Sequence, residues 1–180
     1  MEIANKIKIM KLLLETTVNI LNDNNIPYYL DCGTLLGCVR DNCIMEHDTD
    51  VDITTHLSMW NKLKAINYSR YGLVVKRVIE SYPMCASGNM ITLRTKYSES
   101  LYIDIYTNAA FPLLEKTQMY NIEYNIPVNS DLYLTQLYGE WKIPKKGSHA
   151  ETEYHRGLGL INSKYKPYWD LNYKIFYMPY

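Results

Sequence analysis

The sequence has almost no phenylalanine, no net charge and no long apolar run. Its 180 residues contain 2 Phe against 18 Tyr, and 19 basic side chains balance 19 acidic ones. A neutral chain argues against general binding to nucleic acid or to anionic membranes, although local charged patches stay possible. The composition, 47% hydrophobic and 21% charged, is typical of a folded globular domain and excludes wholesale disorder.

Cysteine is also sparse, and no two cysteines have the C-x-x-C spacing of zinc or redox motifs. The four are Cys32, Cys38, Cys43 and Cys85. We expect them to be reduced thiols. Lysines at positions 6, 8 and 11 interrupt the first apolar segment, which therefore does not resemble a signal peptide. No run approaches the roughly 20 apolar residues of a transmembrane helix. These absences predict a cytoplasmic protein.

The apolar spacing predicts helices and strands that alternate along the chain. Steps of three and four residues indicate an amphipathic helix over 2–22. Thr34 is expected to cap a short helix that runs to Arg40, and Ser130 or Asn129 to cap a helix over 131–138. A further helix is predicted over 57–66. Strands are predicted at 28–31, 50–54, 73–80, 90–96 and 101–107, with an edge strand at 120–127.

This order of elements predicts an α+β (α/β-like) domain with a mixed β-sheet flanked by helices. We expect one domain over residues 1–180. The segment 146–180 is predicted to be an irregular C-terminal wrap that contains a short strand near 173–177.

The strongest chemical signal is a run of acidic residues between Glu46 and Asp52 that contains no lysine or arginine. Val51 and Ile53 are apolar and β-branched, so Asp50 and Asp52 are expected to share the other face of a strand, roughly 6.5–7 Å apart along it. Carboxylates at that spacing repel each other unless a cation neutralises them. Oxygen ligands suit Mg²⁺ or Mn²⁺.

An EF-hand loop is the first alternative, since Asp48, Asp50 and Asp52 match its first three ligand positions. The sixth position, however, is Ile53, where that loop needs glycine for its turn. The twelfth is Met59, where it needs glutamate. We reject an EF-hand.

A third carboxylate, Asp104, stands alone in an apolar strand. An unpaired buried carboxylate is expensive, so three structural explanations compete with metal binding. The residue could pair with Arg94 or Lys96, lie on an edge strand, or face water. The Asp50 and Asp52 pair makes a metal-facing role the favoured one.

A glycine-containing turn, Gly33-Thr34-Leu35-Leu36-Gly37, precedes the acidic run. Backbone N–H groups at the start of a helix bind phosphate well, and the Thr34 hydroxyl would add a donor. Arg40 follows one to two turns later, where its guanidinium could reach phosphate oxygens. Each of these signals is weak alone, and a surface position explains Arg40 equally well.

Together, the glycine turn, the D-x-D strand and the later aspartate follow the layout of metal-dependent nucleotidyl transfer on the DNA polymerase beta-like fold. The stretch YYLDCGTLLGCVRDNCIMEHDTDVDI (28–53) also resembles the signature of the LicD/fukutin phosphotransferases. YIDIY (102–106) and YLTQLYGEWKIP (133–144) resemble two later elements of that family. The resemblance covers about 26–145, which we expect to be the domain core, and the Y-L-x-x-L-Y-G-x-W element is expected to pack against the site.

The resemblance implies a nucleotidyltransferase fold and an enzyme that transfers a substituted phosphate, such as phosphocholine or ribitol phosphate, from a CDP-activated donor to a glycan. It implies two Mg²⁺ or Mn²⁺ ions. The roles that it implies fall on three catalytic metal ligands, Asp50, Asp52 and Asp104, and on five substrate- or phosphate-binding residues, Gly33, Thr34, Gly37, Arg40 and Asp48. One departure is Cys32, which stands where the family commonly has glycine.

Two other functions stay open at this point. The same fold could transfer a nucleoside monophosphate from a nucleoside triphosphate to a protein, a small molecule or RNA. Alternatively, the chain could be a non-catalytic module that binds nucleotide or metal, although clustered carboxylates argue against a degenerate site.

Overall fold

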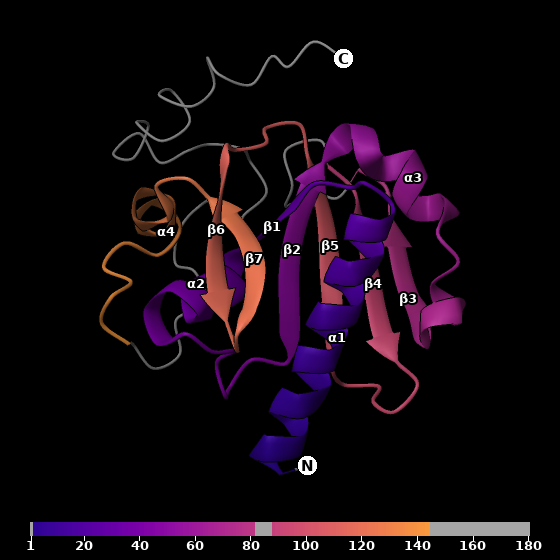
Figure 1. The fold of residues 1–180 in the computed structure, drawn as a ribbon, viewed down its shortest axis with the longest axis horizontal. Helices are drawn as coiled ribbons and strands as arrows, with labels where there is room; N and C mark the ends of the chain where they lie inside the picture. Colours follow the sequence, from indigo (N-terminus) through magenta and orange to yellow (C-terminus); the bar gives the residue numbers. More distant parts are fainter. Residues whose placement is uncertain (1, 82–87, 145–180) are drawn as a thin grey trace.

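The computed structural model describes residues 2–81 and 88–144. Its centre is a five-stranded sheet with the order β1-β2-β5-β4-β3 (Figure 1). Strands β2 and β5 run parallel, and the other neighbours are antiparallel. The strands are β1 (Tyr28–Leu30), β2 (Asp50–His56), β3 (Leu73–Ile79), β4 (Met90–Thr95) and β5 (Tyr102–Asn108). The predicted α+β class with a mixed sheet is confirmed.

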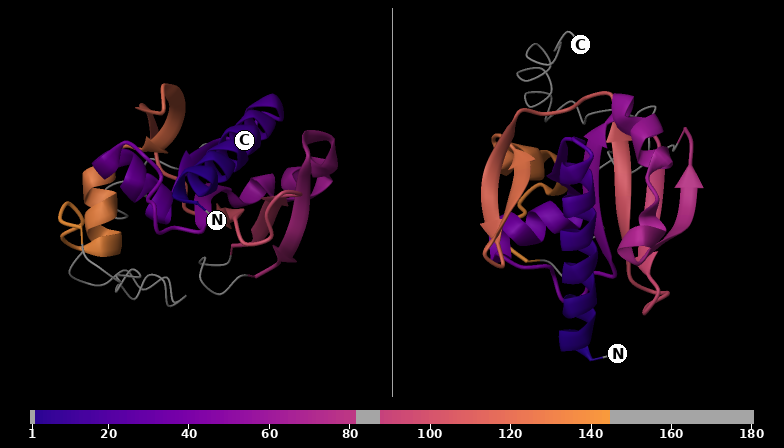
Figure 2. Two further views of the ribbon diagram at one scale, coloured as in Figure 1. Left: turned by 90° about the horizontal axis from the view of Figure 1, so that it is seen from below. Right: turned by 45° about the vertical axis from the view of Figure 1, so that its right-hand side comes forward.

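Helix α1 (Ile3–Asp23) lies along one face of this sheet (Figures 1 and 2). Its apolar stripe, which includes Leu13, Leu14 and Leu21, is fully buried there. The stripe packs on the β-branched side chains of β2 and β5, and each buried leucine contributes about 1.5–3 kcal/mol. The helix predicted over 2–22 is therefore confirmed. Across the two described ranges, no helix combines the length and apolarity needed to cross a membrane.

A β-hairpin forms a separate two-stranded sheet beside β1 (Figure 2). It consists of β6 (Leu114–Met119) and β7 (Ile122–Pro127). The edge strand predicted over 120–127 corresponds to β7, which begins two residues later than predicted, at Ile122, and pairs with β6. Tyr120 and Asn121 both have positive φ, 56° and 63°, and form the two-residue turn that a tight hairpin requires. Strand β6 was not predicted because its sequence, LEKTQM, is mostly polar and exposed.

The remaining helices differ from the predictions mainly at their N-termini. Helix α2 begins at Cys32, because Asp31 and not Thr34 is its N-cap. Asn129 precedes α4 in a left-handed conformation (φ 60°) and makes no side-chain cap, while the Ser130 hydroxyl donates to the Pro127 carbonyl. The helical elements are α2 (Cys32–Asp41), η1 (Leu57–Met59), α3 (Trp60–Ala65), η2 (Tyr68–Tyr71) and α4 (Ser130–Tyr138).

Cys32 has a φ of 46°, in the left-handed region that favours glycine. This backbone conformation explains why glycine suits the position at which the chain departs from the LicD/fukutin pattern. The predicted C-terminal wrap and the strand near 173–177 lie outside the described residues, and the single-domain organisation over 1–180 stays a prediction.

Candidate functional site

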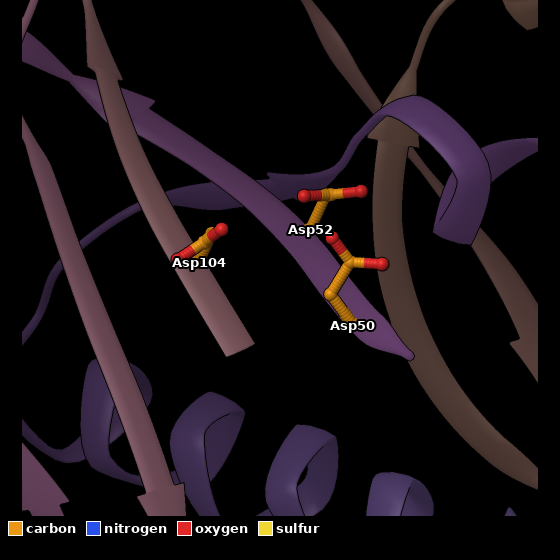
Figure 3. A group of neighbouring side chains, drawn as sticks. All are labelled: Asp50, Asp52 and Asp104. Carbon is orange, nitrogen blue, oxygen red and sulfur yellow. The ribbon is translucent and has the colours of Figure 1, made fainter. Parts of the chain in front are cut away.

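Three carboxylates meet on the face of the sheet opposite α1. Asp52 and Asp104 are paired in register on the parallel strands β2 and β5, and Asp50 lies two residues before Asp52. One oxygen from each side chain lies within 4.8 Å of the others (Figure 3). The alternation that was predicted for β2 is present, since Val51 and Ile53 are fully buried on the face opposite Asp50 and Asp52.

Burial and mutual repulsion raise the pKa values of these carboxyls. Asp52 is 9% exposed and Asp104 is 4% exposed. Desolvation raises the pKa of Asp52 well above its ordinary value, and the charges of Asp50 and Asp104 raise it further. Desolvation also raises the pKa of Asp104, against the lowering effect of its hydrogen bond from Thr92. A bound cation would relieve this repulsion, and a set of three carboxylates fits the hard ions Mg²⁺ and Mn²⁺.

The structure does not show the edge position or the pairings with Arg94 or Lys96 that were considered for Asp104. Its strand is central, with β2 on one side and β4 on the other, so it is not an edge residue. Arg94 donates to the Thr95 carbonyl and lies 3.7 Å from Glu99, while Lys96 lies over the ring of Tyr97. Asp104 instead accepts a hydrogen bond from the Thr92 hydroxyl, and Nη2 of Arg77 lies 4.0 Å from its Oδ2. It faces the carboxylate cluster and not open solvent.

The first turn of α2 lies next to this cluster. The Thr34 hydroxyl oxygen accepts a hydrogen bond from the Asp52 backbone N–H at 2.8 Å, which attaches the helix to β2. A Cβ on Gly33 would lie 3.1 Å from Oδ2 of Asp48, so this turn also faces that carboxylate. Desolvation raises the pKa of Asp48. The nearby His47 lowers this pKa and the charge of Asp50 raises it. The structure thus brings Gly33, Thr34 and Asp48 to the predicted site.

Gly37 and Arg40 lie farther along α2, and here the structure shows packing contacts. A Cβ on Gly37 would lie only 2.4 Å from the Cys43 carbonyl oxygen. The backbone at Cys43 can therefore approach α2 this closely only because residue 37 is glycine. The Arg40 guanidinium pairs with Asp41 at 2.6 Å and donates to the Trp141 carbonyl at 3.4 Å. Their role in phosphate binding stays a prediction.

Asp31 is a buried carboxylate beside the site that was not among the predicted site residues. It is 6% exposed and accepts three hydrogen bonds of 2.7 Å, from the Cys32 N–H, the Thr54 hydroxyl and the Tyr133 hydroxyl. Its own N–H donates to the Asp52 carbonyl at 3.1 Å. Its place at the junction of a strand and a helix was the available signal, because aspartate is a favoured N-cap.

The 133–144 segment packs beside the site, as expected from the resemblance. Tyr138 on α4 is half-buried, and desolvation raises the pKa of its hydroxyl well above the ordinary value. The negative charges of Asp52 and Asp31 also raise it, and α4 packs against α2. The Trp141 indole N–H donates to the Asp131 carbonyl and thereby holds the end of the segment on α4.

Two proteins of rickettsiae match the chain in sequence. RP689, an uncharacterised protein of Rickettsia prowazekii (strain Madrid E), is 30% identical over 146 residues, which cover 72% of this chain and 53% of that protein. RT0683 of Rickettsia typhi (strain ATCC VR-144 / Wilmington), also uncharacterised, is 28% identical over 141 residues, 72% of this chain and 45% of its own length. The chain therefore spans about half the length of these curated relatives.

A similar solved structure is that of the lincosamide antibiotic adenylyltransferase LnuA with lincomycin bound. It has a TM-score of 0.48 and 14% identity, with 67% of this chain and 82% of that chain covered. A family model described as the LicD/FKTN/FKRP nucleotidyltransferase domain matches residues 25–131. This match includes both acidic strands and the whole of α2, and it covers more than half of the sequence. The chain belongs to the LicD/FKTN/FKRP family.

Proposed function

We propose that this chain is a metal-dependent phosphotransferase that moves a substituted phosphate from a CDP-activated donor to a glycan hydroxyl. The observation that carries the proposal is the meeting of Asp50, Asp52 and Asp104 within 4.8 Å of one another, beside the first turn of α2. Membership of the LicD/FKTN/FKRP family supports a transferase of the phosphoryl- or nucleotidyl-transfer type.

Asp50, Asp52 and Asp104 would hold Mg²⁺ or Mn²⁺, two ions in the full site. Such ions would neutralise phosphate charge and lower the pKa of the attacking hydroxyl. The chemistry of the residues fits them, since the three side chains supply only oxygen ligands and two are largely desolvated.

The chain's own groups would bind and orient the reactants. Backbone N–H groups of Gly33 and Thr34 lie in the first turn of α2 and would favour an anionic phosphate. A carboxylate of the cluster would take the proton of the glycan hydroxyl. The hydroxyl oxygen then bonds to the phosphorus of the substituted phosphate, the bond from that phosphorus to the bridging oxygen breaks, and CMP leaves.

A second candidate is transfer of a nucleoside monophosphate from a nucleoside triphosphate. The observation in its favour is the family description itself, which names a nucleotidyltransferase domain. The two reactions differ in which phosphorus is attacked, so the position of a label separates them.

The deciding experiment combines ligand stabilisation with label transfer. Thermal unfolding would be measured with Mn²⁺ and CDP-choline, CDP-ribitol, CTP or ATP. We expect one CDP conjugate to stabilise most, by about 2.7 kcal/mol at a hundred times its Kd. A label on its head group should then appear in the glycan acceptor. Transfer of the nucleotide label from CTP or ATP would support the second candidate, and no stabilisation by any of the four would overturn both.

The control for this experiment is Asp104→Asn, which keeps the shape of the side chain and removes its charge. We expect this variant to lose both the Mn²⁺-dependent stabilisation by nucleotide and the transfer of label. Equal transfer by the variant and the wild type would show that the carboxylate cluster is not the site.

A further inference from the structure

Strand β3 contains a bulge at two adjacent basic residues, Lys76 and Arg77. Val75 pairs with Leu93 and Arg77 pairs with Thr92, so Lys76 is an extra residue in the ladder. With regular pairing, Arg77 would lie opposite Ile91, which is 1% exposed on the α1 side of the sheet. One inserted residue reverses the faces of those that follow it. The bulge therefore moves Arg77 to the face that carries the carboxylates.

Interatomic contacts place both cationic groups on that face. The Arg77 Nη2 atom lies 4.0 Å from Oδ2 of Asp104, and its Nε–H donates to the Thr92 hydroxyl oxygen at 3.3 Å. The Lys76 Nζ atom lies over the ring of Tyr102, 4.2 Å from its centroid. Tyr102 in turn is paired in register with Asp50. Two adjacent residues, which an ordinary strand would direct to opposite faces, thus converge beside one cluster.

The Arg77 guanidinium has the exposure that a ligand-binding group needs. Its separation from Asp104 is at the outer limit of an ion pair, and its side chain is 49% exposed. A guanidinium has five N–H donors, and the bond to Thr92 uses one. Arginine with donors directed toward solvent is suited to bidentate contact with phosphate.

The position of Lys76 and Arg77 relative to α2 indicates what these two residues bind. The sheet order places the first turn of α2 on the β1 side of the carboxylates and Lys76 with Arg77 on their β3 side. A phosphate chain held at the carboxylates through cations would extend toward both flanks, and the β3 flank supplies two positive charges for it.

We propose that Lys76 and Arg77 form a phosphate subsite on the β3 side of the carboxylate cluster, and that this subsite binds a phosphate group of the nucleotide ligand. The proposal deepens the proposed function and rests on it for the nature of the nucleotide. The competing explanation is that Arg77 only serves as a counter-ion of Asp104.

The test compares a double variant with a matched control by titration calorimetry. Lys76→Met/Arg77→Met removes the pair, and Arg70→Met/Lys116→Met removes two exposed cations from η2 and β6. Each protein is titrated with Mn²⁺ alone, and then with inorganic pyrophosphate and with CDP in the presence of Mn²⁺. We expect the first variant to bind pyrophosphate and CDP at least about tenfold more weakly, as loss of charge-assisted hydrogen bonds predicts. The control should bind both as the wild type does.

Titration with Mn²⁺ alone distinguishes the subsite from a counter-ion. Removing a cation 4.0 Å from Asp104 should leave Mn²⁺ affinity equal or higher. Tighter Mn²⁺ binding with unchanged pyrophosphate and CDP binding would overturn the proposal in favour of the counter-ion. Arg77→Lys keeps the positive charge but lacks the paired N–H donors of a guanidinium. We expect its pyrophosphate affinity to lie between those of Arg77→Met and the wild type. An Arg77→Met variant that binds pyrophosphate and CDP as tightly as the wild type would also overturn the subsite.

The two phosphate probes separate this proposal from the proposed function. If the wild type binds pyrophosphate through the pair but not CDP, the subsite stands and the cytidine donor is wrong. If it binds neither in the presence of Mn²⁺, both proposals are overturned.

Discussion

The Tyr133 hydroxyl donates a hydrogen bond of 2.7 Å to Oδ1 of Asp31, a residue 102 positions earlier in the chain. The same carboxylate caps α2 through the Cys32 N–H and accepts from Thr54 on β2. One buried side chain therefore joins α4, α2 and the strand that carries Asp50 and Asp52. This connection ties the position of the distal segment to that of the strand and helix that form the site.

Removal of the Tyr133 hydroxyl should destabilise the fold. Tyr133→Phe deletes one donor to a buried carboxylate, and such bonds contribute about 1.5–3 kcal/mol. Urea unfolding should show a loss of that size. Tyr97→Phe is the control, because Tyr97 is 73% exposed and should be nearly neutral. Equal stability of the two variants would show that Asp31 does not depend on Tyr133.

Neutralisation of Asp52 should stabilise the metal-free protein while it removes metal binding. Asp52→Asn replaces a buried charge that Asp50 and Asp104 repel. We expect a gain of about 0.5–2 kcal/mol in the presence of a chelator, as is common when a functional charge is removed. Mn²⁺ should no longer raise the Tm. Asp23→Asn, on an exposed residue at the end of α1, should change neither quantity.

The raised carboxyl pKa values predict opposite pH dependences for stability and metal binding. Between the ordinary pKa of aspartate and the raised values of Asp52 and Asp104, the folded state binds more protons than the unfolded state. Metal-free stability from these groups should therefore fall as pH rises through that window. Mn²⁺ affinity should rise over the same window, because the ion displaces protons. Parallel thermal scans and Mn²⁺ titrations would check both slopes, and a Mn²⁺ affinity that stays constant on acidification would contradict the prediction.

The Thr34 hydroxyl should hold Asp52 in place. Thr34→Val leaves the buried Asp52 N–H without its acceptor, which costs about 1–3 kcal/mol. We expect lower stability and weaker Mn²⁺ binding, measured by unfolding and by calorimetry. Thr34→Ser keeps the acceptor oxygen and should retain Mn²⁺ affinity. A Val variant that binds Mn²⁺ as tightly as the Ser variant would show that this bond does not position the carboxylate.

The two glycines of α2 should differ in their tolerance of alanine. The Cβ of Gly37→Ala would lie 2.4 Å from the backbone oxygen of Cys43, so the backbone must shift. Overpacking of this kind costs about 1–3 kcal/mol or more. Gly33→Ala would lie 3.1 Å from the end of the Asp48 side chain, which can move. In denaturant unfolding, Gly37→Ala should have a lower free energy of unfolding than Gly33→Ala. The reverse order of stability would contradict these packing distances.

Period-two alternation made the acidic strands predictable. Val51 and Ile53 define the buried face of β2, and this assigns Asp50 and Asp52 to the other face without knowledge of any partner strand. Helix α1 was predictable from a different local period, since its apolar residues recur at steps of three and four. The hairpin of β6 and β7 was not, because β6 has too few apolar residues to show a period.

The sequence by itself determined which residues carry charge and which faces of the strands are apolar, and it made Asp50, Asp52 and Asp104 candidates for one site. Only the tertiary structure decided which atoms meet. The parallel register of β2 and β5 brings Asp104 beside Asp52, and the bulge in β3 adds Arg77. Register and bulges arise from pairing between distant segments, and the periodicity of one segment does not identify which strand will pair with it or which residue each side chain will face.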